Sequence, residues 1–139
     1  MIYLDNAATG GEKPACVQNA VLAAMKACAN PGRSGHARSV ACAKQVFACR
    51  TLLTELFDAP SAERVIFTKN CTEALNLVLL GTLKRGDHVV TTCLEHNSVL
   101  RPLAFLHRTR GVTYDVAPLT DGRLLPDTVA ALVRPETPM

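Results

Sequence analysis

The chain is 139 residues long, 48% of them hydrophobic and 19% charged, which is typical of one globular domain with a sizeable core. The net charge is +3, and the arginines and lysines are scattered along the chain, which argues against a nucleic-acid partner. No apolar run is long enough to cross a membrane and the first residues do not resemble a signal peptide. We therefore expect a cytoplasmic protein with no membrane partner.

Residues 1–60 are predicted to form an N-terminal helical segment. A short strand over residues 2–4 leads into a turn-rich stretch. Apolar residues at helical spacing then predict a helix over residues 14–28 and a longer helix over residues 39–57. In the longer helix, the apolar residues alternate at spacings of four and three, which places both of its cysteines on a buried face.

Residues 61–139 are predicted to be the first part of a larger and incomplete α/β domain. Strands alternate with helices there, which is typical of βαβ units and of a mostly parallel sheet with helices on both faces. The predicted strands cover residues 64–68, 88–92 and 112–117, and the predicted helices cover residues 72–83, 98–109 and 126–133. The last residues leave a helix and would lead into a further strand.

The cysteines and histidines give no pattern that indicates a metal site. Six cysteines are present, and no two of them form a CxxC pair. In a cytoplasmic protein we expect reduced thiols that pack as small hydrophobic side chains. Cys93 and His96 have a CxxH spacing, but no complete set of ligands can be named, so no metal is expected.

The sharpest local feature lies between the strand predicted at 64–68 and the helix that follows it. Asn70 is a good helix N-cap, and Glu73 stands at the third helical position, where it completes a capping box. The backbone amides of Cys71 and Thr72 would then face outward at a helix N-terminus, which favours an anion. The alternative is an ordinary capped helix with no ligand.

His96 follows the next predicted strand and is expected at the same edge of the sheet as Thr72. Ligands bind at this edge in open α/β sheets. A histidine there can stack on a planar ring, move protons, or face water. A third segment, the glycine-containing loop at residues 30–39, carries Arg33 and His36. It either lines an anionic pocket or is a solvated connector.

Five segments together resemble the class V aminotransferases, and within them the cysteine desulfurases. They are residues 3–9 (YLDNAAT), 30–36 (NPGRSGH), 67–76 (FTKNCTEALN), 86–90 (GDHVV) and 95–99 (EHNSV). The resemblance implies the N-terminal part of a fold-type I transferase that depends on pyridoxal 5′-phosphate. It implies that Cys71 and Thr72 hold the cofactor phosphate and that His96 stacks on the ring and acts in catalysis. Arg33 and His36 would lie at the active-site mouth, near a dimer interface.

The resemblance also implies that this chain is truncated. Family members are much longer, and their cofactor-binding lysine and persulfide-carrying cysteine match positions beyond Met139. We therefore expect the isolated chain to be inactive. The complete protein would be a homodimer that converts L-cysteine to L-alanine and leaves an enzyme persulfide. The alternatives are a selenocysteine lyase, another class V enzyme, or a non-catalytic phosphate-binding or assembly subunit completed by a second chain.

Overall fold

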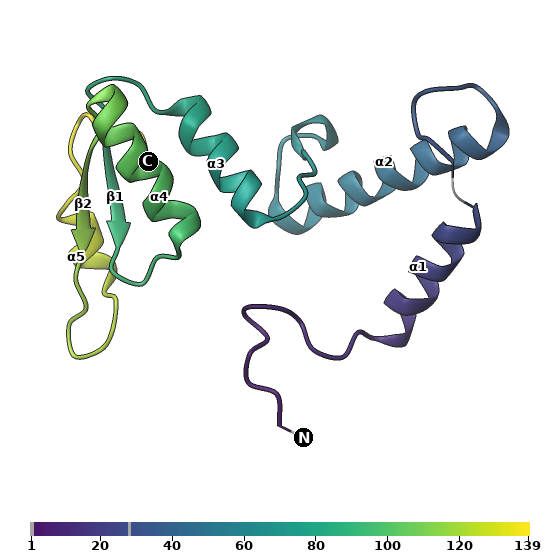
Figure 1. The fold of residues 1–139 in the computed structure, drawn as a ribbon, viewed down its shortest axis with the longest axis horizontal. Helices are drawn as coiled ribbons and strands as arrows, with labels where there is room; N and C mark the ends of the chain where they lie inside the picture. Colours follow the sequence, from purple (N-terminus) through teal and green to yellow (C-terminus); the bar gives the residue numbers. More distant parts are fainter. Residues whose placement is uncertain (1, 28) are drawn as a thin grey trace. The chain divides into compact units, whose positions relative to one another are not determined.

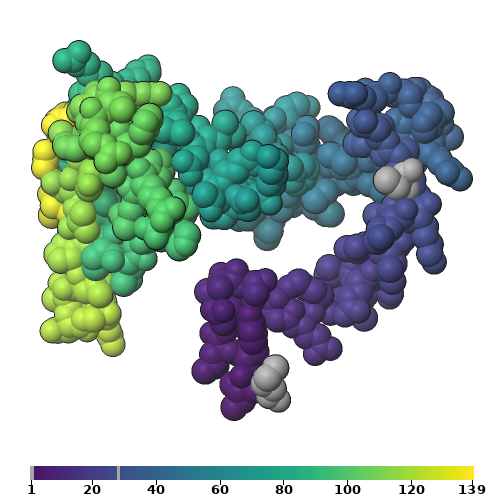
Figure 2. Space-filling model, in the orientation of Figure 1, coloured from purple at the N-terminus to yellow at the C-terminus, as the bar shows by residue number. Residues whose placement is uncertain are grey.

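The computed structural model describes residues 2–27 and 29–139, which fall into two compact units, Met1–Ile66 and Phe67–Met139 (Figure 1). The elements of the first unit are α1 (Ala15–Ala27), α2 (Ala37–Phe57) and the short 3-10 helix η1 (Ala62–Arg64). The elements of the second unit are α3 (Cys71–Thr82), β1 (His88–Thr92), α4 (Asn97–Arg110), β2 (Thr113–Ala117) and α5 (Pro126–Ala130). Figure 2 shows the surface of the same residues with the sequence colouring.

The strand predicted over residues 2–4 is wrong. This segment belongs to a loop in which the Tyr3 hydroxyl donates to the carbonyl oxygen of Thr9 at 2.9 Å. The Asn6 side-chain oxygen accepts from the amide of Gly11 at 3.0 Å. A side chain at Gly11 would place its Cβ 2.8 Å from the Tyr3 ring, so a larger residue there would have to displace that ring. Since no described segment of the first unit forms a strand that could pair with residues 2–4, the polar groups of this loop make hydrogen bonds within the loop instead.

Both helices predicted in the first unit are present, although Cys28, at the predicted end of the first, lies outside the described residues. Helix α2 begins after His36, whose side chain accepts from the amide of Ser39 at 3.2 Å, and it ends at Asp58, which adopts a left-handed conformation with φ 50°. The buried face predicted for α2 is wrong, because Cys49 is exposed and Cys42 only half-buried. Ser39 is the one buried residue among those described in this unit, so no second layer covers the helix.

The strand predicted over residues 64–68 is also wrong. Its first residue ends η1, and Val65 is extended with φ −88° and ψ 111°. The following residues carry no ladder, and Ile66 is 69% exposed. The apolar pattern was suited to a strand, but a strand also needs a neighbouring strand to bind its amides and carbonyls, and the described residues supply none.

The second unit contains a two-stranded parallel sheet, in which β1 pairs with β2 from His88↔Thr113 to Thr92↔Ala117. Helix α4 connects the two strands, as a parallel pair requires. The last residues of the chain form no strand but lie beside β1. The amides of His88 and Val90 donate to the carbonyls of Glu136 and Met139 at 2.9 and 3.2 Å, so residues 136–139 run beside β1 on the side away from β2.

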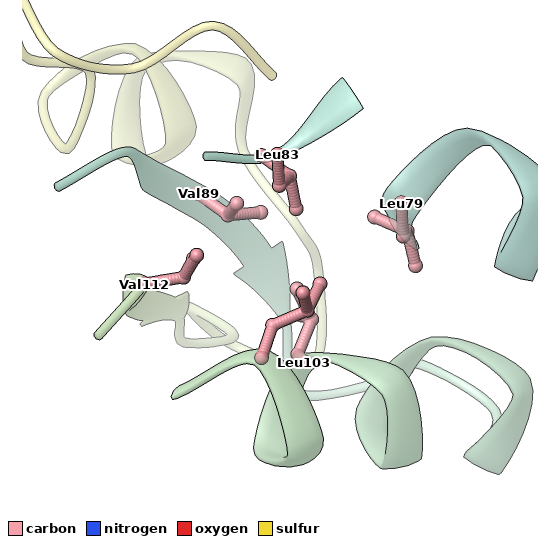
Figure 3. Close-up of a cluster of buried hydrophobic side chains, with 6 residues drawn as sticks. Leu79, Leu83, Val89, Leu103 and Val112 are labelled. Atoms are coloured by element: carbon pink, nitrogen blue, oxygen red, sulfur yellow. The ribbon is translucent and has the colours of Figure 1, made fainter. Parts of the chain in front are cut away.

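The core of the second unit is a cluster of aliphatic side chains between the sheet and helices α3 and α4 (Figure 3). Each of these residues is at most 5% exposed. They come from α3, the turn after it, β1, α4 and the residue that precedes β2. The members are Leu79, Leu83, Val89, Leu103, Leu106 and Val112. This cluster packs the C-terminal part of α3 against α4, the two helices whose first turns carry the predicted site residues.

Polar contacts tie the same elements together. The Arg110 guanidinium, at the end of α4, donates to the carbonyls of Leu80 and Leu83 at 2.8 and 2.9 Å and so caps the end of α3. His88 is fully buried, and its ring nitrogens lie 2.7 Å from the Thr137 hydroxyl and 3.3 Å from the Asp115 carboxylate. These contacts join the C-terminal ends of α3 and α4 and tie β1 to β2 and to the last residues of the chain.

Candidate functional site

The N-terminus of α3 has the capped geometry that the sequence indicates. The Asn70 side-chain oxygen accepts from the amide of Glu73 at 2.8 Å, and the Glu73 carboxylate accepts from the amide of Lys69 at 2.7 Å. Among the described residues, no acceptor binds the amides of Cys71 or Thr72. These two amides and the positive end of the helix dipole therefore remain available to an anion.

The N-terminus of α4 is capped by His96. Its Nδ1 accepts from the amide of Ser98 at 3.1 Å and lies 3.0 Å from the Ser98 hydroxyl. Because Nδ1 accepts a hydrogen bond, the proton of the neutral ring is on Nε2. The ring is exposed, whereas Ser98 is only 8% exposed. The structure thus holds Nδ1 of the imidazole against Ser98, while His96 as a whole stays exposed.

Both helix N-termini open into one pocket of about 580 Å³, within the roughly 300–1,000 Å³ that is usual for small-molecule sites. Its polar lining comes from the first two turns of α3 and α4 and from the residue before α4, and its apolar lining from farther along both helices. The residues are Thr72, Asn76, Leu80, His96, Asn97, Ser98, Arg101, Pro102 and Phe105. The structure therefore brings Thr72 and His96 together in one lining, although the strand that was predicted to precede Thr72 is absent.

Three of the lining residues, Asn76, Ser98 and Arg101, were missed by sequence reasoning. The Asn76 side-chain nitrogen donates to the carbonyl of Thr72 at 2.8 Å and contacts the carbonyl of Ser98 at 3.4 Å. Arg101 supplies a positive charge to the lining, and among the described residues it has no salt bridge. The four-residue spacing from Thr72 to Asn76 is the signal that could have found the asparagine, since such pairs lie on one helix face.

The other predicted site residues lie outside this pocket. Cys71 is exposed on the first turn of α3 and is not part of the lining. Arg33 and His36 belong to the first unit. Arg33 lines a separate pocket of about 770 Å³ beside α2, together with Lys44 and Phe47, while His36 is the N-cap of α2.

The described residues hold no metal cluster and no membrane-spanning helix. No group of three or more histidine, cysteine, aspartate or glutamate side chains there could hold a metal ion. Likewise, none of the helices seen in these residues has the length and apolar character needed to span a membrane. The five described cysteines are free thiols.

The arrangement of two capped helix N-termini around one pocket can be compared with known proteins. The family model described as Aminotransferase class-V matches residues 2–139. This chain belongs to the class-V aminotransferase family. The resemblance seen in the sequence is therefore confirmed.

The similar proteins include a cysteine desulfurase from Yersinia pseudotuberculosis serotype IB. It is 33% identical over 138 residues, which cover 96% of this chain and 34% of the relative. The solved structure of a cysteine desulfurase from Thermococcus onnurineus is 33% identical with a TM-score of 0.81. That match covers 94% of this chain and 34% of the other. The chain thus spans about a third of the length of the relatives it matches.

A more distant structural likeness concerns the fold alone. The cystine C-S lyase C-DES is 21% identical with a TM-score of 0.71, over 89% of this chain and 33% of that protein. Its structure carries glycine covalently linked to a pyridoxal-phosphate cofactor. The α/β class predicted from the sequence is confirmed to the extent that two parallel strands and their helices match these structures, while the predicted larger sheet is not formed by the described residues.

Proposed function

We propose that this chain forms the phosphate-binding part of a cysteine desulfurase that depends on pyridoxal 5′-phosphate. The observation that carries the proposal is that Thr72 and His96, on two separate helix N-termini, line one pocket. The family membership supports a cofactor of this type, and the desulfurases among the relatives support L-cysteine as substrate. The complete protein would act as a homodimer and release L-alanine.

The residues present fit this cofactor. Its phosphate is a dianion, and the amides of Cys71 and Thr72 bind no acceptor among the described residues. Its pyridine ring is flat, and His96 offers an exposed ring in the same lining. Arg101 adds a positive charge to that lining, which suits a ligand with a net negative charge.

Each residue would have a distinct role. The Cys71 and Thr72 amides and the Thr72 hydroxyl would hold the phosphate, which fixes where the ring lies. The chemistry that bound pyridoxal 5′-phosphate supplies is that of an electron sink for the substrate carbon. The His96 ring would cover one face of the pocket and exclude water there, and its Nε2 would hold or pass a proton. Cys71 is proposed only as a backbone donor.

Other parts of the reaction would come from residues outside this chain. The resemblance places the covalent lysine and the sulfur-carrying cysteine beyond Met139. We therefore propose that the isolated 139-residue chain binds the phosphate ester but does not turn over cysteine. Arg33 and His36 remain a proposal for the active-site mouth, on the strength of the family motif alone.

The test uses pyridoxine 5′-phosphate, which lacks the aldehyde and so cannot react with surface lysines. Calorimetric titration of the chain should show saturable binding, and pyridoxine without the phosphate should bind far more weakly. Thr72→Val removes the hydroxyl at constant size and should weaken binding about tenfold, the effect of one charge-assisted hydrogen bond.

The matched control is Thr82→Val at the other end of α3, where the hydroxyl bonds only to the carbonyl of Val78. It should leave the affinity for pyridoxine 5′-phosphate unchanged. Equal affinities for the wild-type chain and Thr72→Val, or equal binding with and without the phosphate, would contradict the proposed phosphate site.

A second candidate function is a non-catalytic phosphate-binding or assembly subunit that another chain completes. The observation that favours it is the exposed apolar surface of the first unit, including Leu22, Met25 and Phe57 at 56%, 70% and 73% exposure. Such surface is rare on a monomer that functions alone. Cysteine turnover by a longer protein that contains this chain would exclude this candidate.

A further inference from the structure

We infer that Asn76 and Ser98 are positioning residues that fix the His96 ring relative to the anion-binding turn at Thr72. This inference rests on the proposed function for its purpose, but the contacts that carry it are independent of any ligand. All four residues line the same pocket, and three hydrogen-bond contacts join them in one chain across the gap between α3 and α4.

The chain of contacts starts at Asn76. Its amide group has two hydrogens, and its nitrogen lies 2.8 Å from the carbonyl of Thr72 and 3.4 Å from the carbonyl of Ser98. The first contact stays within α3, whereas the second crosses to the first turn of α4. Asn76 is therefore a bridge between the turn that holds Thr72 and the turn that holds His96.

The chain of contacts continues through Ser98. Its amide donates to His96 Nδ1 at 3.1 Å, and its hydroxyl lies 3.0 Å from the same nitrogen. Ser98 is 8% exposed, so water does not compete freely for these groups. A displacement of Ser98 therefore moves the imidazole and weakens the preference for a proton on Nε2.

A bridge of this kind has a functional reason. The first turns of helices fray easily, and the two turns here belong to helices that are separated in sequence by β1. A ligand that is held at one end by Thr72 and covered at the other by His96 needs a constant separation between them. Misplacement of about 1 Å at such a site is enough to lose much of its activity.

The residue type fits this role more closely than its alternatives. Aspartate has the shape of asparagine, but its carboxylate cannot donate a hydrogen bond to either carbonyl oxygen, and leucine has no polar group at all. Glutamine keeps the donors but is one methylene longer. The geometry therefore predicts that only asparagine makes both contacts without moving α4.

The experiment measures the His96 tautomer and ligand affinity in the complete 139-residue chain. Long-range ¹H–¹⁵N spectra of the imidazoles report which nitrogen carries the proton, and His96→Asn identifies the His96 signals. In the wild-type chain the proton should be on Nε2. Ser98→Ala removes the hydroxyl beside Nδ1, and Asn76→Leu removes the contact that holds the Ser98 backbone in place. Each should raise the Nδ1-protonated population by up to about fivefold, the effect of losing one net hydrogen bond at Nδ1.

The affinity measurements separate positioning from a general loss of structure. Asn76→Leu should weaken pyridoxine 5′-phosphate binding about fivefold, yet leave the affinity for inorganic phosphate within about twofold of wild type, because the proposed hydrogen bonds to the phosphate all come from the first turn of α3. Gln45→Leu, at an exposed amide on α2, should change neither ligand's affinity nor the tautomer. If Asn76→Leu does not fold by circular dichroism, Asn76→Gln is measured by the same criteria.

Each possible result either supports or overturns the positioning role. A changed tautomer population together with the selective loss of pyridoxine 5′-phosphate binding supports the inference. An unchanged tautomer in the Asn76 variant overturns it, whatever the affinities. If the wild-type chain binds neither ligand, the proposed function fails for this chain, and the tautomer spectra alone then support or overturn the positioning role.

Discussion

Replacing Leu103 with alanine tests whether the second unit has the core described above. Leu103 is fully buried on α4 and belongs to the six-residue aliphatic cluster. The substitution removes three carbons, each worth about 0.8 kcal/mol of burial, and leaves a cavity that α3 and β1 cannot fully close. The free energy of unfolding should therefore fall by about 3–5 kcal/mol.

The expected loss in the free energy of unfolding is large compared with the total stability of the second unit. A unit of about 70 residues has a stability of roughly 4–10 kcal/mol, so Leu103→Ala should remove a third of it or more. With a urea dependence of about 1 kcal/mol/M, the midpoint followed by circular dichroism should fall by about 3 M or the unit should be unfolded without urea. Leu100→Ala, on the same helix but 38% exposed, should shift the free energy of unfolding by less than about 1.5 kcal/mol. Equal shifts for the two variants would refute the assignment of the core.

Two further predictions concern polar contacts. Arg110→Ala removes both hydrogen bonds to the end of α3 and should lower the free energy of unfolding by about 1–2 kcal/mol in urea titrations. The control Arg108→Ala should change it by less than about 0.5 kcal/mol. A similar loss in both variants would show that the contacts of Arg110 with α3 do not stabilise the unit. The pKa of Glu63 is held below its ordinary value by a hydrogen bond from its own backbone amide, then by one from Ser61 and by the charge of Arg50. Because the folded pKa lies below the unfolded one, this contribution to stability is present above the unfolded pKa and is lost as the pH falls through the folded pKa. Carboxyl NMR titration of Ser61→Ala should show the Glu63 pKa moved up, and an unmoved value would exclude the serine contact.

The helices were predictable because their signals are local. The capping pair Asn70 and Glu73 lies within four residues, and the start expected at Thr72 is one residue from the observed start at Cys71. The two wrong strands, at residues 2–4 and 64–68, had the composition of strands. A strand is completed only by a neighbour elsewhere in the chain, which composition does not reveal. The buried face predicted for α2, on which Cys49 proved to be exposed, failed for the same reason. Periodicity shows which face of a helix is apolar but not whether another element covers it.

In the candidate site as well, local sequence signals pointed to some residues, whereas contacts between distant segments were missed. Thr72 and His96 were each expected to start a helix after a strand, and therefore to lie at one edge of a sheet. Both residues line one pocket, but only His96 follows an observed strand, so their proximity comes from the packing of α3 on α4. The bridging contact of Asn76 was not predictable, because its partner Ser98 lies 22 residues away and is reached only through the packing of α3 on α4.

The short segment beside β1 has a consequence for amide hydrogen exchange. The amides of His88 and Val90 bond to residues 136 and 139, whereas the amide of Cys93, just after the strand, bonds to Ala117 in β2. Deuterium uptake at the first two positions therefore reports the release of the chain's last residues, and uptake at the third reports the opening of the parallel pair. Amides in and just after β1 thus report two separate events in the second unit, the release of the last residues and the separation of β1 from β2. Exchange in deuterated solvent is enough to distinguish them.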